Sequence, residues 1–193
     1  IKIISDTAQA IGSKYQNKFS GTVADIGGYS FNYHKHINTG EGGMIVTNNQ
    51  NLATRCKLIR NHGEAVIKKN NKSISNILGY NFRLGEIESA IGIEQFKKLN
   101  KIISFRQKLA KTFVEGISNL KGLKTPIVKK GNTHVYYIIP FILNLKELKF
   151  NRKKIIKLLN KEKIKGIVGG YTNLHLLPVF KNKIAYGKKG FPW

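Results

Sequence analysis

The chain has 193 residues and a formal net charge of +24, from 34 lysine and arginine residues against 10 aspartate and glutamate residues. Hydrophobic residues make up 41% of it, enough for a packed core in one domain or slightly more. No apolar run is long enough to span a membrane, and the single cysteine, Cys56, excludes an internal disulfide framework. We therefore expect a protein of the reducing cytoplasm.

The excess of basic residues could indicate a nucleic-acid-binding protein, because clustered cations release counterions from phosphates. Here the lysines are spread along the whole chain, and Lys, Asn and Ile are all abundant, as an AT-biased coding sequence would produce. No zinc-ligand spacing and no RNA-binding aromatic motif accompanies them. We expect no specific nucleic-acid partner, although a non-catalytic basic binding or regulatory module stays open as an alternative.

The first element expected along the chain is a short strand at residues 1–5, which ends at Asp6. A carboxylate at the carboxyl end of a strand lies where open α/β sheets bind ligands. Taken alone, Asp6 would more often be a turn or helix-capping residue.

Residues 29–46 predict a strand, a turn and a second strand, with Lys35 in the turn. An aromatic run ends in Ser30, Lys35 follows five residues later between His34 and His36, and a glycine-rich stretch and a second apolar run come next. A lysine is nucleophilic only as the neutral amine, and the pKa of a free lysine is about 10.4. Desolvation or cationic neighbours in a packed turn could supply the neutral form. Without further support, Lys35 would be a surface lysine in a hairpin.

A first helix is expected after the Asn-rich residues 48–51, which predict a turn and a helix cap. It carries Leu52, Cys56 and Ile59 and ends at Gly63. The polar residues that follow, 68–75, predict a loop.

Two further helical stretches are expected, one from near Gly85 and one around residues 109–117, with apolar residues at helical spacing that we expect to be core. These residues are Leu84, Ile87, Ile91, Leu109, Phe113 and Ile117. Gly122 and Pro126 then end the helical region and mark a change of domain. We expect residues 1–121 to form one domain and residues 122–193 a second, smaller one.

In the second part, residues 135–143 predict a strand, and Pro140 within it indicates a bulge or a sheet edge. Residues 151–163 predict an amphipathic helix, and residues 164–168 could return as a strand.

Five ordered motifs make the sequence resemble the DegT/DnrJ/EryC1/StrS family of sugar aminotransferases, which are pyridoxal-phosphate enzymes of fold type I. The matching segments are residues 6–12, 29–35, 39–44, 61–63 and 78–84, with a further likeness around Leu174 and His175. The resemblance implies an α/β, aspartate-aminotransferase-like fold. Part of the large-domain sheet with its helices would be followed by a small, truncated α+β domain.

The resemblance also implies a role for each matched residue. Lys35 would carry pyridoxal 5'-phosphate as a Schiff base and shuttle protons between the α-carbon of the substrate and C4′ of the cofactor. Asp6 would pair with the pyridinium nitrogen and keep it protonated, so that the ring accepts the electrons of a carbanion. Gln9 would lie beside the phenolic oxygen of the ring, and Ser30 would donate its hydroxyl to the cofactor phosphate.

Three more residues are carried over from the family. Asn81 would reach the phosphate of the neighbouring subunit's cofactor, and Arg83 would face the anionic substrate there, so that the catalytic unit would be a homodimer with shared sites. His175 would approach the sugar, although Asn173 stands where the family segment often has proline.

The activity implied is transfer of an amino group from an amino acid, expected to be glutamate, to a nucleotide-linked keto sugar for polysaccharide or amino-sugar synthesis. A dehydratase branch of the family has histidine in place of the Schiff-base lysine. Here His34 and His36 flank the position, but the residue five after Ser30 is Lys35. We favour transamination and keep sugar dehydration as the alternative.

The chain also has the features of a fragment. It begins within a strand-like run and ends on residues 191–193 with no obvious terminus. The family's first part contains a Gly-Thr phosphate loop, an aromatic residue that stacks on the cofactor and the early strands of the sheet. Because these are missing, we expect a piece of a longer enzyme that is inactive alone.

Overall fold

The computed structural model describes residues 1–64, 77–187 and 189–192. The loop predicted at residues 68–75 lies outside these residues. The chain divides into two compact units, which are considered separately below. The first comprises residues 1–120 and 125–141, and the second comprises residues 121–124 and 142–193.

A three-stranded sheet of order β1-β4-β5 forms the centre of the first unit. Strand β1 (Ile4–Asp6) pairs in parallel with β4 (Ile26–Ser30), and β5 (Gly43–Val46) pairs antiparallel with β4. The strand, turn and strand predicted around the lysine are therefore confirmed. Because β1 and β4 run in the same direction, Asp6 and Ser30 both lie toward the carboxyl-end edge of the sheet.

A small hairpin lies between β1 and β4 in the sequence. Strand β2 (Lys14–Tyr15) pairs with β3 (Lys18–Phe19), and a short 3-10 helix, η1 (Ser20–Thr22), follows. The two turn residues, Gln16 and Asn17, have φ angles of 45° and 66°. Positive φ at both positions gives the turn a twist that matches the twist of the paired strands.

The two long helices of this unit begin where the sequence predicted. Helix α1 (Gln50–Arg60) is capped by Asn49, whose side-chain oxygen accepts a hydrogen bond of 3.0 Å from the backbone N–H of Leu52. Helix α2 (Glu86–Gly116) begins directly after Gly85. The two helical stretches expected in this region are one continuous helix.

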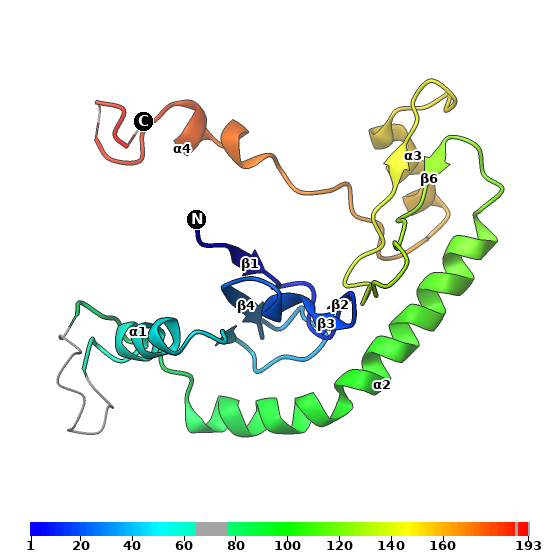
Figure 1. Ribbon diagram of the computed structural model, residues 1–193. Coiled ribbons are helices and arrows are strands. Elements are labelled where there is room, and N and C mark those ends of the chain that lie inside the picture. Colours follow the sequence, from blue (N-terminus) through cyan, green and yellow to red (C-terminus); the bar gives the residue numbers. More distant parts are fainter. Residues whose placement is uncertain (65–76, 188, 193) are drawn as a thin grey trace. The chain divides into compact units, whose positions relative to one another are not determined.

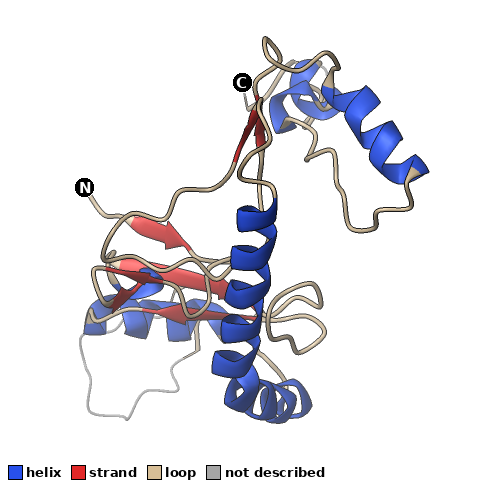
Figure 2. Ribbon diagram, turned by 90° about the vertical axis from the view of Figure 1, so that its right-hand side faces the viewer, coloured by secondary structure: helices blue, strands red, loops and turns tan. Residues whose placement is uncertain are grey.

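The core of the first unit lies between α2 and segments that are distant in the sequence. Helix α2 runs alongside the part of the unit that contains the strands (Figures 1 and 2). The buried cluster consists of Ile11, Ile37, Leu99, Ile103 and Val135. It joins the N-terminal segment, the β4–β5 connection, α2 and the segment before β7.

The prediction that the apolar stripes of α2 are core was wrong for most of their members. Ile87 is 76% exposed and Phe113 is 45% exposed, whereas the buried residues of α2 are Leu99, Ile103 and Ala110. At 1.5 Å per residue the helix is about 46 Å long, far longer than the cluster that it contacts. Helical spacing identifies the apolar face of a helix, but it does not show how much of that face is covered.

The strand predicted at residues 135–143 is also absent over most of its length. Only Ile142–Leu143 forms a strand, β7, which pairs antiparallel with β6 (Leu123–Lys124) in the second unit. Residues 125–141 belong to the first unit instead of the predicted second domain.

Side chains of α2 explain this difference. The guanidinium of Arg106 donates to the carbonyl of Tyr136 at 3.1 Å, and the amide of Gln107 donates to the carbonyl of His134 at 3.0 Å. Tyr136 also has a φ of 50°, which interrupts extended backbone. Three of the carbonyls that a sheet would use are therefore bound to side chains of α2.

The second unit contains β6, β7 and three helical elements. These are α3 (Arg152–Lys161), the 3-10 helix η2 (Leu174–Leu176) and α4 (Pro178–Lys181). Asn151 caps α3 through a hydrogen bond of 3.0 Å from the N–H of Lys154, so the predicted helix is confirmed. Residues 164–168, predicted as a strand, are not one. Within the described ranges of both units, no helix has the length and apolar character that crossing a membrane requires.

Candidate active site

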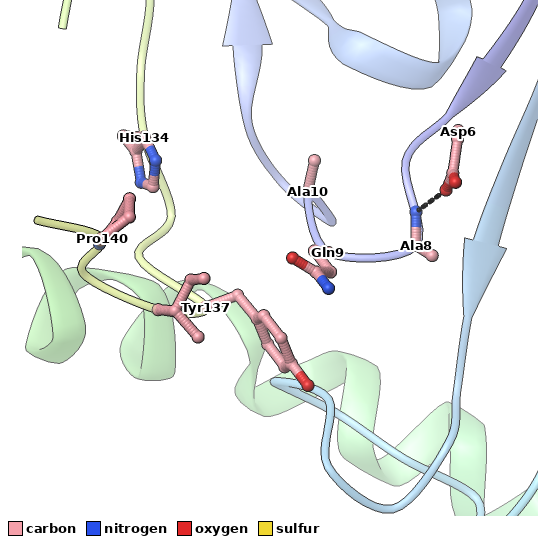
Figure 3. A pocket seen from close by; sticks show the side chains of 8 residues that line it. Asp6, Ala8, Gln9, Ala10, His134, Tyr137 and Pro140 are labelled. Carbon is pink, nitrogen blue, oxygen red and sulfur yellow. Dashed lines mark hydrogen bonds between the residues drawn. The ribbon is translucent and has the colours of Figure 1, made fainter. Parts of the chain in front are cut away.

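An open pocket of about 510 Å³ lies in the first unit, between the turn after β1 and the segment before β7 (Figure 3). This volume is in the usual range of small-molecule sites. Two of the residues predicted to bind a cofactor, Asp6 and Gln9, line it. The complete lining is Asp6, Ala8, Gln9, Ala10, His134, Tyr137, Ile138 and Pro140.

Asp6 is the last residue of β1, so the sheet fixes its backbone. Its Oδ1 accepts a hydrogen bond of 3.1 Å from the backbone N–H of Ala8, which closes a tight turn directly after the strand (Figure 3). The side chain is exposed to the pocket, and Oδ2 takes no part in this bond. Asp6 can therefore present a carboxylate oxygen to a bound ligand.

Lys35 lies in the connection between β4 and β5. Its backbone N–H donates to the carbonyl of Asn32 at 2.9 Å, and its side chain is half-buried. The Nζ atom lies 4.6 Å from the centre of the Tyr137 ring, and that ring lines the pocket. The amine of Lys35 thus contacts a ring that lines the pocket of Asp6 and Gln9, but Lys35 itself is not one of the lining residues.

The connection around Lys35 is held by the residues that follow it. The Nε2 of His36 donates to the carbonyl of Val135 at 2.8 Å, and Ile37 is only 2% exposed. The backbone of Phe31 closes the base of the connection, because its carbonyl accepts from Thr39 at 3.0 Å. These contacts fix a segment that has little regular secondary structure.

The surroundings of two histidines beside the pocket disfavour their charged forms. Burial lowers the pKa of His36, the hydrogen bond to Val135 opposes this, and the charges of Arg106 and Lys35 add to the lowering. Burial also lowers the pKa of His134, whose Nδ1 accepts a hydrogen bond of 2.9 Å from the N–H of Tyr136. In neutral His134 the proton is therefore on Nε2.

His36 contains one buried atom without a partner. With Nε2–H bound to Val135, Nδ1 of the neutral ring is an acceptor, and no hydrogen-bond donor reaches it among the residues that the structure describes. Such an atom is costly to bury. Protonation of His36 would place a proton on this buried atom, where no acceptor in the described residues receives it.

Ser30 is the last residue of β4, at the sheet edge that also carries Asp6, but it does not line the pocket. Its Oγ accepts a hydrogen bond of 3.3 Å from the N–H of Asn32, at the start of the connection that carries Lys35. Its predicted contact with the cofactor phosphate remains a prediction.

The other predicted residues lie elsewhere. Asn81 forms an antiparallel bridge with Asn61, and Arg83 donates from Nη1 to Oδ1 of Asn61 at 2.9 Å. Both are exposed, and neither lines the pocket near Lys35. His175 is an exposed residue of η2 in the second unit. Their roles stay predictions.

Sequence reasoning missed Tyr137. Its pattern predicts only an apolar residue of a strand, and nothing in it distinguishes Tyr137 from its neighbours. Its place in the site depends on the contact with Lys35, which is distant in the sequence.

The residues of the pocket fit pyridoxal phosphate by their chemistry. An aldehyde requires a primary amine for covalent attachment, and Lys35 supplies one. A pyridine nitrogen that must stay protonated requires a carboxylate, and Asp6 supplies that.

The comparison with protein families agrees with this donor set. The model of the DegT/DnrJ/EryC1/StrS aminotransferase family matches residues 1–193. GDP-perosamine synthase of Escherichia coli O157:H7 is 34% identical to the chain over 75% of the chain and 38% of its own length.

Solved structures show the same likeness. PseC of Helicobacter pylori, an aminotransferase of pseudoaminic acid biosynthesis, superposes with a TM-score of 0.80 at 29% identity, over 97% of this chain and 50% of its own. The E. coli GDP-4-keto-6-deoxy-D-mannose-3-dehydratase, with bound hydrated pyridoxal phosphate, gives 0.74 at 30% identity, over 86% of this chain and 45% of its own. The chain spans about half the length of the curated relatives that it matches, or less.

Proposed function

Because the chain belongs to the DegT/DnrJ/EryC1/StrS aminotransferase family, we propose that the protein containing it is a pyridoxal-phosphate-dependent sugar aminotransferase. It moves an amino group from an amino acid to a nucleotide-linked keto sugar, as the names of its relatives suggest. The observation that carries the proposal is the contact of the Lys35 amine with the ring of Tyr137, which lines the same pocket as Asp6 and Gln9.

Each residue of this site has a task in such a reaction. Lys35 would hold the cofactor through its amine, and its Nζ would accept and return the proton of the amino donor. Asp6 would keep the ring nitrogen protonated, and Gln9 and Ser30 would orient the ring oxygen and the phosphate. When bound, pyridoxal phosphate supplies a ring that accepts the electron pair left on carbon.

The structure favours transamination over sugar dehydration through the positions of the two flanking histidines. His34 is exposed, and its ring lies against that of Tyr33 with ring centres 3.7 Å apart. The ring of His36 lies 6.1 Å from that of Tyr137, but His36 is buried and its Nε2 is bound to the carbonyl of Val135. Neither histidine takes the place of the lysine.

The proposal extends to partners. We propose glutamate as the amino donor, the cytoplasm as the location and a homodimer as the catalytic unit. Asn81 and Arg83 support the dimer, because they are exposed and lie outside the pocket that Asp6 and Gln9 line. In a dimer they would complete the site of the partner.

The test is product analysis with the complete protein, pyridoxal phosphate, glutamate and a panel of GDP- and UDP-linked keto sugars. We expect an amino sugar and 2-oxoglutarate in equal amounts. A dehydrated, amine-free sugar would support the dehydratase alternative. Neither product, from a protein that takes up no cofactor, would support a non-catalytic module.

A further inference from the structure

The ring of Tyr137 is placed to hold a cation. It lines the pocket, and the Nζ of Lys35 lies 4.6 Å from its centre, within the range of a cation–π interaction. Figure 3 shows the ring extending from its own segment into the space beside Gln9. In the described part of the chain, Lys35 forms no ion pair, so the ring is its charged group's observed partner.

Hydrogen bonds hold the backbone on both sides of the contact, that of Tyr137 and that next to Lys35. Arg106 on α2 donates from Nη1 to the carbonyl of Tyr136 at 3.1 Å and to that of Tyr137 at 3.4 Å. The next residue after Lys35, His36, donates to the carbonyl of Val135 at 2.8 Å. The Tyr137 segment is thus bound to α2, and the hydrogen bond from His36 joins it to the segment that carries Lys35.

We propose that Tyr137 is a positioning residue that holds the amine of Lys35 at the pocket through the face of its ring. The lysine stem is flexible and would otherwise sample many conformations. A neutral ring restrains the amine without engaging it in an ion pair, so the amine can leave the ring and react with an aldehyde. This inference rests on the proposed function for its consequence in catalysis, but the contact itself does not depend on that function.

The test compares Tyr137→Phe, which keeps the aromatic face, with Tyr137→Leu and Tyr137→Met, which remove it, in the complete protein. Phe150→Leu is the matched control, because it removes another contact between a lysine and a ring, that of Lys154 at 4.1 Å, in the second unit. Circular dichroism identifies variants that fold, and two non-aromatic variants guard against the loss of one.

The first readout needs no cofactor. An amine-acetylating reagent is applied to the apoprotein, and mass spectrometry gives the labelling of Lys35 relative to that of the exposed Lys153. We expect both non-aromatic variants to raise this ratio about three- to tenfold, because the ring no longer covers or attracts the amine. Tyr137→Phe and Phe150→Leu should leave it unchanged.

The second readout is the rate of covalent capture of pyridoxal phosphate. We expect a reduction of roughly three- to tenfold in the non-aromatic variants and rescue by Tyr137→Phe. If Tyr137→Phe behaves like Tyr137→Leu in either readout, the hydroxyl and not the ring face matters, and the inference is overturned. If the unmodified protein captures no cofactor, the proposed function fails, while the labelling ratio still decides whether the ring holds Lys35.

Discussion

The two units of the chain differ in what holds their residues in place. Every buried hydrophobic residue of the described chain belongs to the first unit, and the list is Ile11, Ile37, Leu58, Leu99, Ile103, Ala110 and Val135. In the second unit, α3, η2 and α4 contain no buried residue. The predicted catalytic residues, Lys35 and Asp6, lie in the unit that has a core, whereas His175 does not.

The same contrast appears at the level of single segments. Helix α3 forms from local signals, namely a cap at Asn151 and an amphipathic sequence, and Leu158 within it remains 41% exposed. The connection that carries Lys35 is irregular, but it is fixed by His36 and Ile37 through contacts with distant residues. Regular secondary structure is therefore a poor guide to which segment positions a reactive group.

The largest expected effect is a loss of activity, and it should differ between variants of the first and of the second unit. Lys35→Ala should abolish transamination, because no other amine is placed to bind the cofactor at this pocket in the described structure. His175→Ala, in the second unit, should leave cofactor attachment unchanged and alter only the KM for the sugar. Steady-state kinetics and cofactor absorbance check both. Full activity of the Lys35→Ala variant would contradict the proposal that the reactive amine lies in the first unit.

The second prediction concerns the electron sink. Asp6→Asn removes the negative charge opposite the ring nitrogen and should lower kcat on the order of 10²–10³-fold. Some cofactor should still bind, because Lys35 remains. Asp25→Asn is the matched control, since that carboxylate is paired with Lys2 at 2.8 Å and lies outside the pocket lining. Equal losses in both variants would contradict the assignment of Asp6.

The third prediction compares stabilities. Ile37→Ala deletes a side chain that is 2% exposed and should cost about 2–5 kcal/mol of unfolding free energy. Leu158→Ala deletes one that is 41% exposed and should cost about 1 kcal/mol or less. Denaturant unfolding of the complete protein measures both. A larger cost for the Leu158 variant would mean that the second unit is the better packed of the two.

The smallest effect is a pH dependence of the first unit. Burial lowers the pKa of His36 below its ordinary value of 6.5, so the unfolded chain binds a proton at a higher pH than the folded chain does. Stability should be constant above about pH 7 and fall as the pH drops through 6.5 toward the folded pKa. His134 adds in the same direction.

His36→Gln tests this, because glutamine can donate to Val135 and does not titrate. The loss of stability between pH 7 and pH 5, measured by denaturant unfolding, should become smaller in this variant. An unchanged loss would show that other groups cause it.

Local signals predicted the local structure well. The cap at Asn49, the helix after Asn151, the start of α2 after Gly85 and the strands on either side of Lys35 all follow from short motifs. The family resemblance implies the site residues; in the structure Asp6 and Gln9 line one pocket, and Lys35 contacts Tyr137, another residue of its lining.

Long-range contacts explain what the sequence could not predict. Apolar residues 135–141 have the composition of a strand, but Arg106 donates to the carbonyls of Tyr136 and Tyr137 and Gln107 to that of His134, so the segment is bound to α2 instead. Tyr137 has no motif of its own. Its contact with Lys35 spans more than a hundred residues of sequence, and no local pattern encodes it.

The most direct test of the proposed site is to identify which lysine binds the cofactor covalently. The complete protein is incubated with pyridoxal phosphate, reduced with borohydride and digested, and the modified peptide is sequenced by mass spectrometry. The account predicts modification of Lys35 alone, with none at the other lysines once excess cofactor is removed. Modification at any other lysine with Lys35 free, or no modification in a protein that forms the amino sugar, would contradict it.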